Sequence, residues 1–186
     1  MDLEVREKFI NITRDKDWAD VRTVTWHNED SMRDDLLSMD AHCAYKFVGH
    51  VEGNSYSGRL KYLQNCRSVI VAHALDWIQH YQPLMRSSGS EQNYVQVQRD
   101  FSDLESTMEM LLTMPEEAKR IADNNVMTFR ERHLTPAAET CYWRRLIRGW
   151  KEVTFEPQFW NPTTEQWRGV PWESFALERR LEWDPY

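Results

Sequence analysis

The residues best suited to chemistry lie in a short segment from Gly53 to Arg59, which reads GNSYSGR. Gly53 lets the backbone turn tightly beside a ligand, Ser57 can cap a following helix, and Arg59 would lie in the first turn of that helix. A guanidinium binds two phosphate oxygens at once, and a helix N-terminus adds free N–H groups and partial positive charge. The segment therefore predicts a phosphate or pyrophosphate site, although an ordinary turn followed by a surface arginine would have the same sequence.

Two predicted strands would hold this segment in place. Tyr45–Val51 is a plausible strand that ends just before the turn, and a helix is expected from about Ser57 to Asn65. Ser68–Ala72 (SVIVA) is a short, continuously apolar run, as in strands buried on both faces of a parallel sheet. In such a unit the turn lies at the carboxyl end of the first strand, where α/β folds bind ligands.

The rest of the pattern predicts strands that alternate with helices, and then helices alone. The other expected elements are a helix over Leu3–Thr13, a strand over Val21–Trp26, a helix over Ser31–Cys43, a short strand over Tyr94–Val97, a helix with a capping box of Ser102 and Glu105, a helix beginning at Pro115, and one beginning at Thr135-Pro136 and reaching about Trp150. This order indicates an α/β layer domain with a small, mostly parallel sheet.

The C-terminal residues have a different character. Trp160, Trp167, Trp172 and Trp183 lie there among several prolines. Because proline at this density interrupts helices, residues 151–186 are expected to form an irregular strap. We interpret these tryptophans as packing residues rather than as surfaces that stack on a sugar.

The composition argues against several classes of protein. With 186 residues, the chain is long enough for one domain with a core. It has 23 Lys+Arg against 30 Asp+Glu, which argues against general affinity for nucleic acid or anionic membranes. No apolar run approaches the roughly 20 residues of a membrane span. The histidines lack metal-ligand spacing, and Asp34-Asp35 fits the first turn of a helix better than a metal site.

Over a longer stretch, the sequence resembles glycosyltransferase family 90, which includes protein O-glucosyltransferases and fungal capsule-associated xylosyltransferase-like proteins. The resemblance is carried by EGNSYSGRLKYLQNCRSVIVAH, with CAYKF before it and Asp76-Trp77 after it, and by the later stretch from RDFSDLE to CYWRRLIRGW. It runs from about Asp17 to Trp150. Its sharpest points are the Ser-x-Arg-x-Lys element (Ser57, Arg59, Lys61) and the Cys-Tyr-Trp element (Cys141, Tyr142, Trp143).

This resemblance implies a Rossmann-like layer domain from the C-terminal half of a GT-B glycosyltransferase, with a helical C-terminal run. The GT-B fold has two such domains that face each other across a cleft. The donor-binding residues implied are Gly53, Asn54, Ser55, Tyr56, Ser57, Gly58 and Arg59. They would wrap the diphosphate of a UDP-sugar, with Arg59 on the pyrophosphate and without a divalent metal or other cofactor. Arg67 departs from the animal enzymes, which have glycine there, and arginine needs more room and water at that turn.

For the complete enzyme, the resemblance implies inverting transfer of a sugar from UDP-glucose or UDP-xylose to a hydroxyl of a protein or polysaccharide acceptor. A carboxylate of the N-terminal domain would act as the base. We find no match to that domain, so the chain is expected to bind UDP weakly and to be inactive alone. A truncated gene model, a fragment and a degenerate paralogue remain open. The alternative function is a non-catalytic interaction module that retains the fold.

The same resemblance suggests the domain organisation and the compartment. Residues 1–16 would be a connector helix, residues 17–150 the nucleotide-sugar-binding domain, and residues 151–186 the strap. Cys43 and Cys66 would form a disulfide, as at the matching positions of the family, and Cys141 would match a cysteine that pairs with the N-terminal part. The full-length protein is thus expected in the lumen of the endoplasmic reticulum or Golgi, with or without a membrane anchor, although this chain carries no targeting signal.

Overall fold

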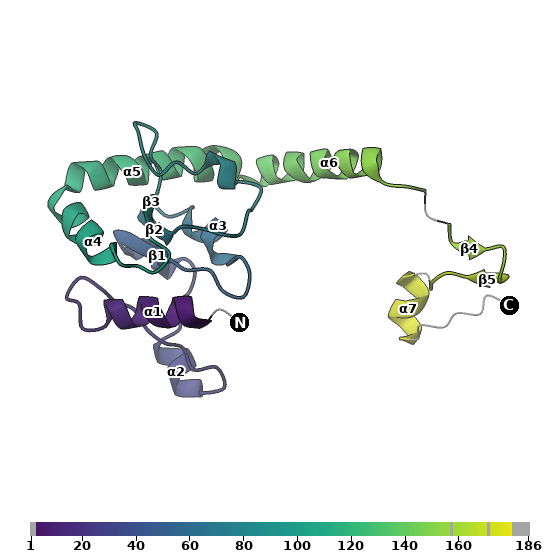
Figure 1. Ribbon diagram of the computed structural model, residues 1–186, viewed down its shortest axis with the longest axis horizontal. Coiled ribbons are helices and arrows are strands. Elements are labelled where there is room, and N and C mark those ends of the chain that lie inside the picture. The colour runs from purple at the N-terminus through teal and green to yellow at the C-terminus, as the bar shows by residue number, and fades with distance from the viewer. Residues whose placement is uncertain (1–2, 157, 171, 180–186) are drawn as a thin grey trace. The chain divides into compact units, whose positions relative to one another are not determined.

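Three parallel strands form the sheet around which the first part of the chain is built. The computed structural model describes residues 3–156, 158–170 and 172–179. Strands β1 (Phe47–His50), β2 (Val69–His73) and β3 (Val95–Val97) lie in the order β1-β2-β3 (Figure 1). Every residue of β2 is buried, because β2 is the central strand and has neighbours on both sides and on both faces. The three strands predicted in this region are confirmed.

The other elements follow the strands in a βα order and then become helical. They are α1 (Leu3–Thr13), α2 (Glu29–Asp34), the 3-10 turns η1 (Ala41–Ala44) and η2 (Gln82–Leu84), α3 (Arg59–Leu63), α4 (Leu104–Thr113), α5 (Pro115–Thr128), the π-helical turn η3 (Phe129–His133), α6 (Pro136–Val153), the hairpin strands β4 (Trp160–Asn161) and β5 (Gln166–Trp167), and α7 (Trp172–Glu178). The chain divides into two compact units, residues 1–140 and 141–186.

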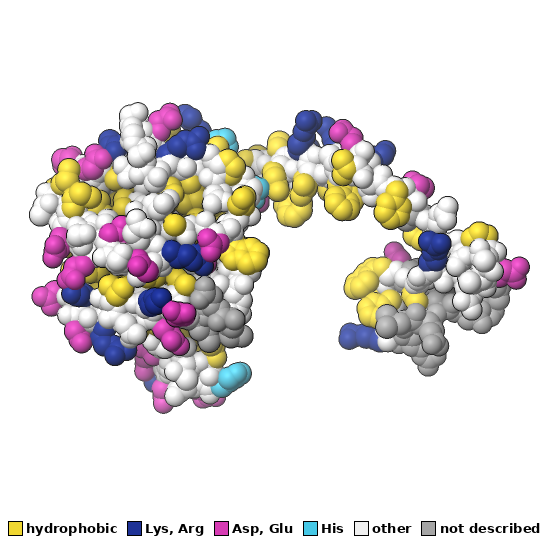
Figure 2. Space-filling view, viewed as in Figure 1, with side chains coloured by type: hydrophobic (Ala, Val, Ile, Leu, Met, Phe, Trp, Pro, Cys, Tyr) yellow, Lys and Arg dark blue, Asp and Glu magenta, His cyan; other side chains and the backbone are white. Residues whose placement is uncertain are grey.

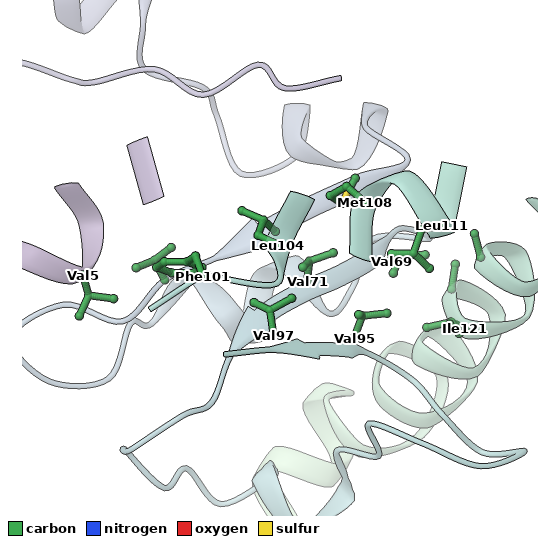
Figure 3. Close-up of a cluster of buried hydrophobic side chains, with 13 residues drawn as sticks. Val5, Val69, Val71, Val95, Val97, Phe101, Leu104, Met108, Leu111 and Ile121 are labelled. Carbon is green, nitrogen blue, oxygen red and sulfur yellow. The ribbon is translucent and has the colours of Figure 1, made fainter. Parts of the chain in front are cut away.

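Alternate residues of the strands feed two separate cores, because successive side chains of a strand point to opposite faces. Val69 and Val71 of β2 face a cluster that includes Phe101, Leu104 of α4 and Ile121 of α5 (Figure 3). On the other face, Val48, Ile70 and Ala72 pack with Leu60 and Leu63 of α3 and with Tyr81 and Phe129. The first unit is therefore a mixed α/β layer structure, which is compatible with a Rossmann-like glycosyltransferase domain.

Two predicted elements in the first part of the chain are wrong. Val21–Trp26 forms no strand: it is mostly exposed, and Arg22 instead pairs with Asp20 and donates to the Asp34 carbonyl. The helix expected over Ser31–Cys43 ends at Asp34, and only η1 follows it. Asp34 and Asp35 therefore lie at the end of α2 rather than in its first turn.

Helix starts are predicted with mixed success. Pro115 begins α5, and Thr135 caps α6 by accepting a hydrogen bond from the Ala138 N–H over 3.1 Å, as expected. The capping box of Ser102 with Glu105 is wrong. Asp103 occupies the N-cap of α4 without a side-chain cap bond, because its carboxylate accepts the N–H of Gln98 instead.

The second unit contains a helix with two chemically different sides. Figure 2 shows hydrophobic side chains along one side of α6 and Lys and Arg side chains along the other. Further on, the rings of Trp160 and Trp167 pack edge to face across the β4–β5 hairpin, with centroids 5.5 Å apart. The region predicted to be irregular thus contains a small hairpin and α7, whereas Trp183 lies outside the described residues. Within the described ranges, no helix is both long and apolar enough to span a bilayer.

Candidate functional site

The carboxyl ends of the three parallel strands meet around a buried carboxylate. Glu52, two residues beyond β1, is 3% exposed and accepts the backbone N–H groups of Asp76 (3.2 Å) and Trp77 (3.0 Å), which follow β2. Arg99, two residues beyond β3, donates from Nη1 to Glu52 Oε2 over 3.1 Å and pairs through Nη2 with Asp76 Oδ2 at 3.0 Å. One carboxylate therefore ties together the segments that follow all three strands.

His73, the last residue of β2, belongs to the same network and has both ring nitrogens engaged. Its Nε2 accepts the backbone N–H of Glu52 over 3.0 Å, and its Nδ1 lies 2.8 Å from the Ala74 carbonyl. Nε2 can accept a hydrogen bond only when it carries no proton. The ring proton is therefore on Nδ1, which donates a hydrogen bond to the Ala74 carbonyl oxygen. These two hydrogen bonds fix the backbone where β1 leads into the candidate loop.

The loop from Gly53 to Arg59 leaves β1 next to this network. The Gly53 N–H donates to the Ser55 carbonyl over 3.1 Å, which closes a tight turn. The space where a Gly53 side chain would begin is occupied by the guanidinium of Arg6 from α1, 2.7 Å away. Arg6 is held there because its Nε donates to the Glu52 carbonyl over 3.1 Å. Gly53 thus allows a close approach of a cation, without a left-handed backbone conformation.

The helix after the loop is shorter than predicted and is capped differently. Helix α3 has five residues and begins at Arg59, with Gly58 as N-cap and no side-chain cap bond. Ser57 is buried and offers its carbonyl, rather than its hydroxyl, to the Leu60 N–H. The predicted capping role of Ser57 is therefore wrong. A helix this short also contributes little dipole, so the positive charge at this loop comes mainly from its side chains.

Arg59 differs from the neighbouring cations because no acid neutralises it among the described residues. Lys61 pairs with Glu139 at 2.7 Å and Arg67 with Asp123 at 2.6 Å, whereas the exposed Arg59 has no such partner. The pKa of Arg59 is lowered because protein atoms crowd it and because Arg6 is also positive. Even with this lower pKa, the Arg59 guanidinium keeps its charge at neutral pH. Two like charges near one turn, neither paired with an acid among the described residues, favour the binding of an anion.

A second buried histidine, His50 at the end of β1, lies beside these cations. It is 1% exposed, and neither ring nitrogen has a hydrogen-bond partner in the described part of the protein. Burial is the main cause that lowers the pKa of His50 to about 3, and the nearby Arg59, His73 and Arg6 lower it further. The ring is therefore neutral at physiological pH and carries an unused N–H donor.

This histidine should make the stability of the protein depend on pH. In the unfolded chain His50 has its ordinary pKa of about 6.5, so below that pH the unfolded state binds a proton that the folded state does not. The contribution of His50 to stability is therefore fully present above pH 6.5 and is lost as the pH drops toward 3. Between pH 7 and pH 5 we expect a loss of about 2 kcal/mol from this residue. Urea unfolding at both pH values should show this slope in the wild type, and His50→Phe should remove that part of it.

A disulfide connects the two ends of the segment that contains β1, the candidate loop and α3. A disulfide joins Cys43, just before β1, to Cys66, just after α3, with Cα atoms 4.8 Å apart. The expected pairing is confirmed, and Cys141 is free and exposed.

Two further predictions concern Arg67 and a metal ion. Arg67 next to Cys66 is exposed and forms an ion pair with Asp123. Within the described part of the chain, no three His, Cys, Asp or Glu side chains gather as a metal site requires, and metal independence stays a prediction.

Sequence reasoning identified the loop but missed four residues that surround it. Glu52 and Arg99 are 47 positions apart, Arg6 comes from α1, and His50 is one of the histidines whose spacing gives no sign of a site. One signal was available for two of them. Charged residues that closely follow buried parallel strands, as Glu52 and Arg99 do, are brought to the same edge of the sheet.

Together, the parallel sheet and the cationic loop at its carboxyl edge form a mixed α/β layer structure that is compatible with a Rossmann-like domain. The family model described as "Glycosyl transferase family 90" matches residues 3–166. The chain therefore belongs to glycosyltransferase family 90.

Curated relatives agree with this membership. The chain is 29% identical over 123 residues to an "O-glucosyltransferase rumi homolog" of Aedes aegypti, covering 64% of this chain and 30% of that protein. It is 29% identical over 136 residues to "O-glucosyltransferase rumi" of Drosophila pseudoobscura pseudoobscura, which covers 66% of this chain and 30% of that protein. It is 28% identical over 124 residues to "O-glucosyltransferase rumi" of Drosophila melanogaster, which covers 61% of this chain and 27% of that protein. The chain thus matches about 30% of the length of these relatives.

Proposed function

We propose that the loop from Gly53 to Arg59 binds the diphosphate of a UDP-sugar and forms the donor site of an inverting glycosyltransferase. The observation that carries this proposal is Arg59, an exposed cation without an acidic partner in the described residues, beside Arg6 at the carboxyl end of β1. The backbone of Asn54, Ser55, Tyr56 and Gly58 would line the same diphosphate. The guanidinium of Arg59 matches the geometry of phosphate oxygens and can bind two of them.

The same charges suit the chemistry of transfer. When the bond between the sugar carbon and the diphosphate oxygen breaks, negative charge accumulates on the departing UDP. Fixed cations near that oxygen stabilise the transition state more than the ground state. Arg59 and Arg6 would supply this stabilisation without a metal ion.

The attacking hydroxyl of the acceptor needs a base, and Glu52 is unsuited to that task. Its carboxylate is buried and already accepts hydrogen bonds from two backbone N–H groups and from Arg99. A base must be free to take a proton within hydrogen-bonding reach of the acceptor. We therefore propose that the base belongs to the partner domain of a GT-B enzyme. On this proposal, these 186 residues bind the donor without transferring its sugar.

The identity of the substrates is part of the proposal. The donor would be UDP-glucose or UDP-xylose, and the acceptor a hydroxyl of a protein or polysaccharide. The Cys43–Cys66 disulfide fits an oxidising compartment, and we propose the lumen of the endoplasmic reticulum or Golgi for the full-length protein.

Isothermal titration with UDP tests the donor site. The wild type should bind, and Arg59→Ala should weaken binding by about 10- to 100-fold, because it removes charge-assisted hydrogen bonds of about 1.5–3 kcal/mol. Arg67→Ala is the matched control: it removes an equally charged, exposed arginine that is paired with Asp123, and should leave the affinity unchanged.

Two results would speak against the proposal. Equal affinity of wild type and Arg59→Ala would remove the role of this arginine. If the folded wild type did not bind UDP at all, a non-catalytic interaction module would become the better description of the chain.

A further inference from the structure

Two buried histidines lie at the carboxyl edge of the sheet, and only one of them has its hydrogen-bonding groups satisfied. His73 uses both ring nitrogens within the protein, whereas neither nitrogen of His50 has a protein partner in the described residues. A buried polar group without a partner is unfavourable and is uncommon in folded proteins. The difference between these two buried rings indicates that the ring nitrogens of His50 serve to bind a ligand.

The position of His50 on β1 directs its ring toward the candidate site. Val48 and His50 point to the same face of the sheet, because they are two residues apart on one strand. Val48 packs in the cluster that contains Leu60 of α3, and His50 is one step closer to the carboxyl end. That end is where α3 begins with Arg59, whose positive charge acts on the His50 ring together with that of Arg6.

We propose that His50 is a ligand-contacting residue of the donor site, and that its ring N–H donates a hydrogen bond to a diphosphate oxygen of the bound nucleotide-sugar. This inference rests on the proposed function of the loop. It adds a neutral donor beneath the two arginines, in a place where a third positive charge would be strongly disfavoured. A neutral donor selects the anion by geometry, since its hydrogen bond has a fixed direction.

Contact between His50 and a ligand requires a shift of the loop. The ring is 1% exposed in the unliganded chain, and residues 53–58, which lead to Arg59, contain neither helix nor strand. The guanidinium of Arg6 fills the space at Gly53 and would be drawn toward a bound diphosphate. Movement of these residues would open the path from the loop to the ring.

Three substitutions of His50 test the proposal by UDP titration at pH 7.5 on the full 186-residue chain. His50→Phe keeps a ring of similar shape without nitrogen, and should weaken UDP binding by about 10- to 100-fold. Its thermal midpoint should equal or exceed that of the wild type, because an unpaired buried polar group has been removed. His50→Asn places an amide nitrogen near the position of Nδ1, and His50→Gln places one near Nε2. One of the two should recover most of the affinity.

The alternative, a purely structural histidine, predicts the opposite pattern. In that case His50→Phe would bind UDP as tightly as the wild type, which overturns the proposal. If His50→Phe does not fold, nitrogen NMR of the wild-type ring gives the answer: UDP should shift the His50 ring signals, and unchanged signals at saturating UDP would overturn it. Failure of the wild type to bind UDP would instead reject the donor site as a whole, so the two failures are distinguishable.

Discussion

Replacing Glu52 with alanine is expected to lower the free energy of unfolding by about 3–5 kcal/mol, the range measured when one member of a buried ion pair is removed. The carboxylate accepts from Asp76 N–H, Trp77 N–H and Arg99, and the substitution leaves all three donors without it. Urea unfolding followed by circular dichroism measures the change. Since this carboxylate joins the segments after β1, β2 and β3, UDP binding should be lost together with stability.

Two further variants separate the charge from its position. Glu52→Gln keeps an acceptor oxygen but turns an amide group toward the donors. It should therefore be less stable than the wild type and more stable than Glu52→Ala. Glu4→Gln is the control, because Glu4 forms an exposed pair with Lys8 within α1 and should leave the unfolding midpoint unchanged. A Glu52→Ala protein as stable as the wild type would mean that the buried network does not hold the strand ends together.

Removal of the Cys43–Cys66 disulfide is expected to cost about 3 kcal/mol of stability. The bond closes a loop with a sequence separation of 23, and cross-links of this size restrict the unfolded chain by roughly that amount. The double variant Cys43→Ala/Cys66→Ala should unfold at lower urea than the wild type. Adding a thiol reductant should bring the wild type down to the same midpoint and should have no effect on the double variant.

The third cysteine supplies the control for this experiment. Cys141 is exposed and unpaired, so Cys141→Ser should change neither the midpoint nor the response to reductant. A wild type that is insensitive to complete reduction would show that the disulfide does not stabilise the unit that carries the loop.

The sheet was predictable because the sequence of its central strand, β2, has an apolar pattern that depends little on the rest of the chain. Val69–Ala72 is continuously apolar, and only burial on both faces accommodates such a run. Val21–Trp26 carries an alternating pattern that is equally compatible with an exposed segment. No neighbouring strand pairs with it, and the polar contacts of Arg22 hold it instead. Alternation predicts a strand only where a partner strand is available.

The candidate site was predictable in its loop and not in its surroundings. Glycine, serine and arginine in the order of GNSYSGR indicate a turn, a helix start and a cation within a few residues. Gly53–Arg59 could therefore be identified from the sequence. The contact of Arg6 with this loop depends on how α1 packs on the sheet, and the ion pair of Glu52 with Arg99 depends on strand order. The predicted cap at Ser57 was wrong because its own carbonyl accepts the Leu60 N–H, and the one at Ser102 was wrong because α4 begins one residue later, with Asp103 as N-cap.

A structure of the chain with UDP bound tests most directly whether the unpaired Arg59 holds a nucleotide diphosphate. We expect the diphosphate beside the Gly53–Arg59 turn, with guanidinium nitrogens of Arg59 about 2.7–3.2 Å from its oxygens. A complex in which UDP occupies a different surface, or in which Arg59 points into solvent while the diphosphate is held by other residues, would contradict this assignment.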